Sequence, residues 1–281
     1  MKKILFILLF LLSFNSCFAF DCDEICVEPY DLSHGASRFM SNVTGSNITA
    51  EAIAGMILKK SILKQANGKF KVNINSYSVK DLKKGIFKSF SLKGKNVNLD
   101  GIQFSELNIK TLCKFNYIGF NEFKKPVFKE ALPVSFSVVM TQDDINKTMD
   151  SPSYRRITDS INMLGKGFFK VTSGQVNIAD NQFYYVLNVA VPFVKNIQKI
   201  VICSDLKIRD GNIDFTNTRL VSNSFMIDLK KIDWLINYIN PLDYSLEVLE
   251  NNNASLTVRN VKIKDNKVYA DGYIVIPKDK G

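Results

Sequence analysis

The sequence has little of what most catalytic and metal sites use. His34 is the only histidine among 281 residues, so a histidine-based triad or a zinc site has almost nothing to use. The chain also has no Gly-x-Ser-x-Gly elbow, P-loop or dinucleotide fingerprint. Its acids are scattered, which gives carboxylate-pair hydrolysis no visible site. We therefore expect no enzyme, no catalytic residue, no metal and no cofactor. A hydrolase without a recognisable motif ranks third, after the two noncatalytic functions given at the end of this section.

Long apolar runs are also scarce, and the one that stands out is at the start. Met-Lys-Lys precedes an apolar run from Ile4 to Phe14, and small residues follow up to Ala19. This order is typical of a bacterial export signal, and the run is about half the ~20 residues that a spanning helix needs. We expect cleavage after Ala19, leaving 281 − 19 = 262 residues in the periplasm or cell envelope. Lipid attachment at Cys17 is the alternative, although Phe14-Asn15-Ser16 matches the usual lead-in poorly.

Cysteines are few, and an export signal would remove Cys17. Four remain as disulfide candidates: Cys22, Cys26, Cys113 and Cys203. Cys22 and Cys26 are close enough to pair locally, and the other two lie in strand-like segments, but all three connectivities stay open. An oxidising compartment favours disulfides over a metal site at residues 21–26, since no histidine accompanies these thiols. We expect no free thiol after cleavage.

Acids are nearly absent from one basic stretch. Eleven lysines and a single acid, Asp81, lie between Lys59 and Lys95, in a chain of net charge +10. Nucleic acid is an unsuitable partner for an exported protein, so the stretch is either a contact for anionic lipid or a solvated face. The candidates for membrane contact are Lys59, Lys60, Lys64, Lys83, Lys84, Trp234 and Tyr238.

The rest of the chain predicts mostly β-structure. Residues 20–48 have no periodicity and are expected to be an irregular lead-in, followed by a helix over 51–66 with Thr49 as its N-cap. Alternating apolar and polar residues predict half-buried strands over 70–74, 107–117 and 134–140, and a change of phase at Gly94 predicts a bulge.

Four short motifs predict hairpins. Asp-Gly or Asp-Asn lies one or two residues after an apolar residue at residues 100–101, 180–181, 210–211 and 265–266. These pairs tolerate the positive φ angles of tight primed turns, so each should join two antiparallel strands.

Three further helices are indicated. Thr141 to Asp144 has the form of a capping box, and Ser151-Pro152 is a cap with proline at the first helical position. Near the end, an apolar stripe from Leu229 to Ile239 is closed by Asn240-Pro241, with Trp234 and Tyr238 four residues apart on the same helix.

One predicted strand, residues 183–194, is apolar on both faces. Asn188 is almost its only polar residue, and Pro192 near its end cannot donate to a ladder. An antiparallel strand normally shows one polar face to water. The second face must therefore be covered by a helix, a second sheet or an apolar ligand.

From about Lys69 onward the chain resembles the LmeA-type bacterial phospholipid-binding family, whose members look like tubular lipid-binding (TULIP-like) domains. The matching pieces are Asp81–Gly85, Val97–Ile102, Met140–Asp144, Asp210–Phe215, Asn240–Pro241 and Val258–Gly272. The resemblance implies a twisted antiparallel sheet wrapped around helices, with an apolar groove for acyl chains. The groove candidates are Phe183, Tyr185, Leu187, Val189 and Val191.

The sequence thus predicts an α+β protein with a signal over 1–19, a lead-in over 20–48 and a lipid-binding domain over 49–281. Its expected role is noncatalytic binding, or transfer, of phospholipids or related envelope lipids. The alternative is a structural or adhesive envelope β-protein with a filled core and no ligand.

Overall fold

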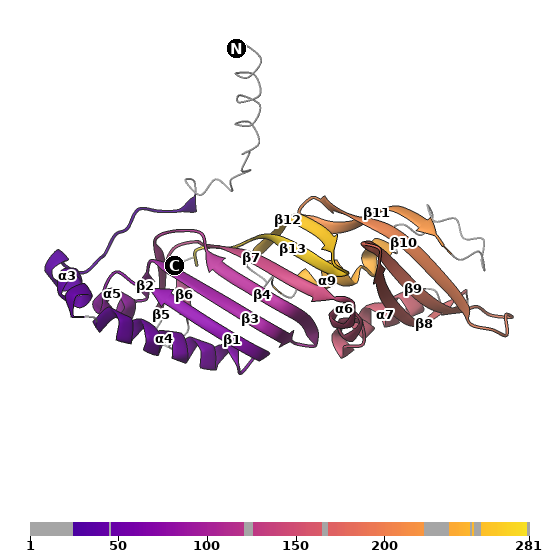
Figure 1. Cartoon of the computed structure of the whole chain (residues 1–281), viewed down its shortest axis with the longest axis horizontal. Helices are drawn as coiled ribbons and strands as arrows, with labels where there is room; N and C mark the ends of the chain where they lie inside the picture. Colours follow the sequence, from indigo (N-terminus) through magenta and orange to yellow (C-terminus); the bar gives the residue numbers. More distant parts are fainter. Residues whose placement is uncertain are drawn as a thin grey trace, which may run out of the picture.

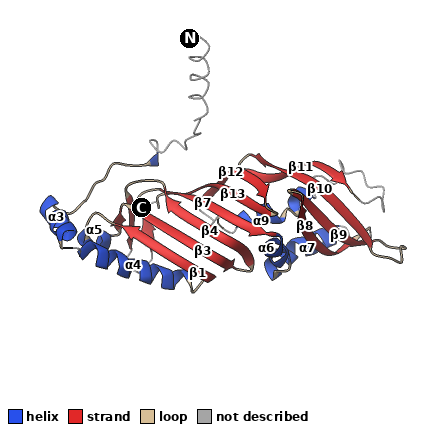
Figure 2. Cartoon of the chain, viewed as in Figure 1, coloured by secondary structure: helices blue, strands red, loops and turns tan. Residues whose placement is uncertain are grey.

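The computed structural model describes residues 25–44, 46–120, 126–164, 168–221, 236–247, 249 and 254–279. Within these residues the chain is an α+β protein in which every strand pairing is antiparallel. A large sheet lies in one half of an elongated molecule and a second sheet in the other, with helices beside and between them (Figure 1, Figure 2). The expected α+β class with antiparallel sheets is confirmed.

The larger sheet has six strands in the order β1-β3-β4-β7-β13-β12. Their bounds are β1 Ala66–Asn75, β3 Ser89–Leu99, β4 Ile102–Thr111, β7 Leu132–Thr141, β12 Ser255–Lys264 and β13 Lys267–Ile276. Apolar side chains such as Phe136 and Val138 are buried on one face, while Ser135 and Ser137 between them are half-exposed. Alternation in the sequence therefore placed β1 and β7 correctly.

The second sheet is a meander of four strands in the order β11-β10-β9-β8. Its strands are β8 Lys170–Ala179, β9 Gln182–Ala190, β10 Gln198–Arg209 and β11 Asn212–Leu220. A small third sheet, in the order β2-β5-β6, consists of β2 Ile86–Phe87, β5 Asn116–Phe120 and β6 Pro126–Phe128.

All four predicted hairpins are present. They join β3 to β4, β8 to β9, β10 to β11 and β12 to β13 through two-residue turns. The first turn residues Asp100, Asp180, Asp210 and Asp265 have φ between 51° and 53°, which is the left-handed conformation that these turns require. The bulge expected at Gly94 lies nearby, at Asn96, whose φ is 50° and where β3 carries an extra residue opposite β1.

Six helices complete the description. They are α3 Gly35–Val43, α4 Ser46–Ile62, α5 Val79–Lys84, α6 Gln142–Met149, α7 Pro152–Leu164 and α9 Pro241–Glu247. The capping box of Thr141 and Asp144 is formed at the start of α6. At α7 the hydroxyl of Ser151 accepts a hydrogen bond from the amide of Tyr154, at 3.2 Å, so both predicted caps are confirmed.

Two local predictions were wrong, and a third feature has a second role. The lead-in contains α3, and α4 begins at Ser46 and ends at Ile62 instead of spanning 51–66. The strand expected over 107–117 is divided into β4 and β5, because residues 112–115 leave the large sheet and Cys113 forms a disulfide. Asn240-Pro241 starts a helix as well as following one, since Asn240 Oδ1 accepts from the amide of Leu242 at 3.0 Å; residues 229–235 lie outside the described part.

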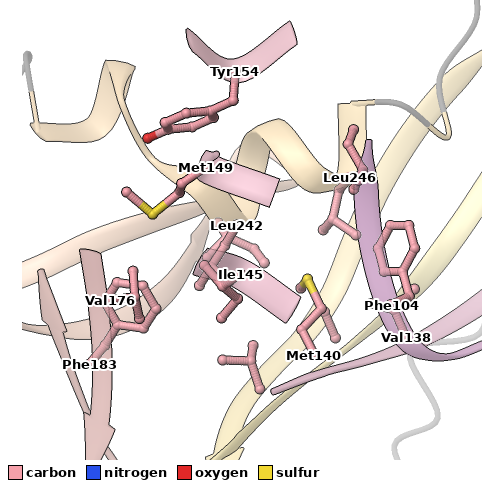
Figure 3. Packing of buried hydrophobic residues seen from close by; sticks show 14 of the residues in the cluster. Phe104, Val138, Met140, Ile145, Met149, Tyr154, Val176, Phe183, Leu242 and Leu246 are labelled. Carbon is pink, nitrogen blue, oxygen red and sulfur yellow. The ribbon is translucent and has the colours of Figure 1, made fainter. Parts of the chain in front are cut away.

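The core at the junction of the two sheets is filled by α6 and α9. Ile145 and Met149 of α6, with Leu242 and Leu246 of α9, lie between side chains of both sheets (Figure 3). The six-stranded sheet contributes Phe104, Val138 and Met140, and the four-stranded second sheet contributes Val176 and Phe183 (Figure 3). This packing fixes the start of α7 against β8 and β9, where the candidate site lies.

Candidate functional site

A pocket of about 500 Å3 lies between α7 and strands β8 and β9. Its apolar lining includes Met149, Ile161, Val171, Leu187 and Ile239. Its charged lining consists of two cations and two anions, namely Arg155, Lys170, Asp150 and Asp159. The volume is in the range of small-molecule sites. The mixed lining suits a ligand that has both an apolar part and a polar part.

Side-chain amides cover much of the free edge of β8 beside this pocket. Asn162 of α7 donates to the carbonyl of Val171 at 3.0 Å and accepts from its amide at 2.7 Å. Asn146 of α6 makes the same pair of bonds with Val176, at 3.0 and 2.7 Å. These contacts satisfy backbone groups that an edge strand would otherwise leave open.

Gly174 lies between the two amide contacts and lines the pocket. It is in phase with Val176 along β8, so its N–H and C=O face the same edge as those of Val176. A β-carbon at Gly174 would lie 2.9 Å from Cε of Met149, 3.3 Å from the hydroxyl of Tyr185 and 3.5 Å from Cδ2 of Leu187. Met149, Tyr185 and Leu187 therefore pack closely around the backbone at Gly174, and any larger residue there would crowd the pocket floor.

Two buried tyrosines form the polar part of the floor. The hydroxyls of Tyr154 and Tyr185 are 3.0 Å apart, and Tyr154 donates to the carbonyl of Ile239 at 2.5 Å. Burial raises the pKa of Tyr154 well above its ordinary value, and burial likewise raises the pKa of Tyr185. Both phenols are therefore neutral hydrogen-bonding groups at physiological pH and poor general bases.

The five predicted groove residues do not all border the pocket. Tyr185 and Leu187 line the pocket, whereas Phe183 has no exposed surface and packs against Phe215 with ring centroids 5.0 Å apart. Val189 is also buried. Val191 lies beyond β9, which ends at Ala190 because Pro192 cannot donate to the ladder and Phe193 has a φ of 68°. Only the middle of the predicted surface borders the pocket.

The second face of β9 is half-buried. Tyr184, Val186, Asn188 and Ala190 all have intermediate exposure. Asn188 donates to Ser173 Oγ on the neighbouring strand at 2.8 Å, and the hydroxyl of Tyr184 bonds to Gln182 at 3.0 Å. The strand therefore alternates between a buried and a partly solvated face, as antiparallel strands usually do.

The structure contains a disulfide, and its pairing is one of those that the sequence left open. Cys26 is bonded to Cys113, 87 residues away in the sequence, so the local bond between Cys22 and Cys26 is excluded; Cys22 itself lies outside the described residues. Cys203 is a buried free cysteine, which contradicts the expectation that no thiol stays free. Its thiol lies 3.5 Å from Oε1 of Gln182, inside the second sheet.

The candidate membrane-contact residues are dispersed. Lys59 and Lys60 are exposed near the end of α4, with Lys64 just beyond it and Lys83 and Lys84 on α5. Lys84 is bound to Asp31 at 2.8 Å. Tyr238 is 56 % exposed and lies just before α9, apart from the lysines, and Trp234 lies outside the described residues.

Other lysines of the basic stretch stand opposite each other on the large sheet. Lys69 pairs with Lys95, and Lys71 with Lys93, across β1 and β3. All four are exposed, and like charges directly opposite destabilise a sheet. An anion on this face would relieve that repulsion.

The described part of the chain contains no group of three or more His, Cys, Asp or Glu side chains that could hold a metal ion. None of its helices is long and apolar enough to cross a membrane. In comparisons with known proteins, no family model, no curated protein and no solved structure matches the chain.

Sequence reasoning missed Asn146, Asn162, Gly174 and Arg155. No motif marks them, because they belong to three elements that meet only in the folded chain. The isolated Gly174 in the middle of a strand pattern was the one available signal, since such a glycine often marks close approach of a backbone or ligand.

Proposed function

We propose that this protein binds a phospholipid or a related amphiphile, without catalysis, in the pocket between α7 and β8–β9. The single observation that carries the proposal is the combination of an apolar floor, with Leu187 and Val171, and a charged rim that holds Arg155 and Lys170. An acyl chain matches the floor and a polar headgroup matches the rim. The disulfide is compatible with export, so we place this binding in the cell envelope.

Gly174 supports the same proposal. Its missing side chain lets Met149 and Leu187 pack against the backbone at the pocket floor, and its edge-facing backbone offers one donor and one acceptor to the polar part of a ligand. We also propose that the sheets and helices form a tubular lipid-binding type of fold, in which this pocket is the acyl-chain site.

The decisive experiment fills the floor of the pocket. Gly174→Val should abolish capture of a fluorescent acyl-chain phosphatidylglycerol, and should lower the lipid found by mass spectrometry in organic extracts of the purified protein. Gly35→Val is the matched control, because a β-carbon at Gly35 has no atom within 4 Å. Equal capture by wild type and Gly174→Val would place the lipid elsewhere.

A second pair of variants uses two adjacent residues on opposite faces of β9. Leu187→Glu puts a charge into the pocket floor, whereas Val186→Glu puts it on the half-solvated face. We expect loss of lipid capture from the first variant alone, with thermal melting confirming that both fold.

The structural or adhesive alternative has its own support. One continuous buried cluster includes Phe183, Tyr185, Leu187 and Val189 together with the residues of the large sheet. If wild-type protein contains no lipid after native purification and captures none of the probe, this alternative is favoured.

A further inference from the structure

Large apolar side chains gather on the exposed surface of α3 and α4. Those of α3 are Phe39, Met40 and Val43, and those of α4 are Ile48, Ile53, Met56 and Ile57, each between 49 % and 73 % exposed. We call these seven residues the α3–α4 apolar surface. In Figure 1 the two helices lie along one margin of the molecule, at the end opposite the pocket-forming strands β8 and β9.

The inward face of α4 is the polar and small one. Glu51 accepts hydrogen bonds from the amide and hydroxyl of Ser76, at 2.5 and 2.8 Å. Gly55 is buried, and a β-carbon there would lie 3.4 Å from the carbonyl oxygen of Val72 in β1. A helix on a protein surface normally buries its apolar stripe and exposes its polar one. In α4 this order is largely reversed: Ile62 at its end packs against the core. Four large apolar residues are instead exposed, namely Ile48, Ile53, Met56 and Ile57.

The segment that leads into α3 is firmly attached, so this exposure belongs to a fixed surface. The Cys26–Cys113 disulfide holds its start. Ser33 donates from its amide and its hydroxyl to the buried carboxylate of Asp81, at 2.6 and 3.0 Å, and Asp31 is bound to Lys84. These contacts present the α3–α4 apolar surface on a rigid support.

The charges around this surface are almost all positive. Lys59, Lys60 and Lys64 are exposed at the end of α4. Among residues 32–80 the only acid is Glu51, and its carboxylate is turned toward Ser76. A second copy packed on the same patch by a two-fold axis would bring these lysines together, which opposes self-association. Exposed apolar residues bordered by lysines are the composition of helices that lie in a membrane interface.

We propose that the α3–α4 apolar surface docks on an anionic lipid bilayer. Phe39, Met56 and Ile57 enter the boundary between headgroups and acyl chains, and the lysines at the end of α4 extend to the lipid phosphates. This docking goes beyond the proposed lipid pocket and uses none of its residues. Within the basic stretch from Lys59 to Lys95, the proposal assigns lipid contact to the lysines next to this apolar surface, which are Lys59, Lys60 and Lys64.

Vesicle sedimentation tests the proposal. The purified protein should sediment with vesicles of phosphatidylglycerol and phosphatidylcholine, more weakly with phosphatidylcholine alone, and less at high salt. Met56→Ser with Ile57→Ser should weaken binding about tenfold or more. Lys59→Gln with Lys60→Gln should weaken it by a similar factor on anionic vesicles only.

Matched controls separate docking from general effects. Phe193→Ser with Ile197→Ser removes apolar residues of comparable or greater exposure, at 107 % and 59 %, from the loop between β9 and β10. Lys264→Gln with Lys267→Gln removes two exposed lysines beside the β12–β13 turn. Both control variants should bind vesicles like wild type.

Four results would overturn the proposal: no sedimentation with anionic vesicles, equal binding to neutral ones, equal losses in the controls, or a lipid-free dimer that Met56→Ser with Ile57→Ser dissociates. The last result would assign the surface to a second copy of the chain. Gly174→Val should leave vesicle binding unchanged, so failure of the pocket and failure of the docking surface are distinguishable.

Discussion

Tyr185 reaches Tyr154 through a 3.0 Å contact between their hydroxyls on the pocket floor. Tyr154 uses its single hydrogen for the carbonyl of Ile239. Tyr185 must therefore be the donor to Tyr154, and the two phenols form a directed chain that ends on the backbone before α9. The chain connects α7, β9 and the segment that leads into α9.

Removing the two hydroxyls should have unequal effects on stability. Tyr154→Phe leaves both the Tyr185 hydroxyl and the Ile239 carbonyl without a partner, so we expect the free energy of unfolding to fall by about 1–3 kcal/mol. Tyr185→Phe removes one bond and leaves no donor unpaired, so we expect a loss of about 0.5–1.5 kcal/mol. Urea denaturation measures both, with the exposed Tyr238→Phe as control. A larger loss from Tyr185→Phe would contradict this donor order.

Stability should fall at alkaline pH. Burial raises the pKa of Tyr154 and of Tyr185 above the ordinary value near 10. The folded state therefore holds these protons more tightly than the unfolded chain, and their contribution is fully present below pH about 10 and decreases as the pH rises above it. Tyr30, whose hydrogen bond to Glu130 raises its pKa to about 12, contributes in the same direction.

Unfolding measured between pH 9 and 11.5 checks this. A double variant with phenylalanine at residues 154 and 185 should lose stability less steeply with pH than wild type, since it keeps Tyr30 and lacks the two buried phenols. Parallel curves for the two proteins would show that the buried pair does not titrate on unfolding in this range.

The disulfide should be a major source of stability. Cys26 and Cys113 close a long loop, since their sequence separation is 87, so replacing both by serine should lower the free energy of unfolding by about 2–4 kcal/mol. Cys203→Ser is the control for removal of a thiol that forms no bond.

Alkylation followed by mass spectrometry checks the cysteine assignments. Cys203 is buried, so it should react only after denaturation, while peptides that contain Cys26 and Cys113 should stay linked until a reductant is added. A linked peptide that contains Cys203 would contradict the assignment.

Local chemistry determined the turns and caps. Asp100, Asp180, Asp210 and Asp265 were identified from the sequence because a tight hairpin requires positive φ and few residues adopt it easily. The capping box of Thr141 and Asp144 was predictable for the same kind of reason, since both partners lie within one helical turn. Such features need no information from the rest of the chain.

The use of each apolar surface was decided by tertiary structure alone. The sequence marked residues 183–194 as apolar but could not assign Phe183 to a packed core and Leu187 to a pocket, because that depends on where α7 and β11 pack. It predicted a helix in α4 but not that Ile57 faces outward while Gly55 touches β1. Cys26 likewise found Cys113 rather than its neighbour Cys22. In each case a backbone preference is set by a few adjacent residues, whereas the partner of a side chain is set by segments that only the folded chain brings together.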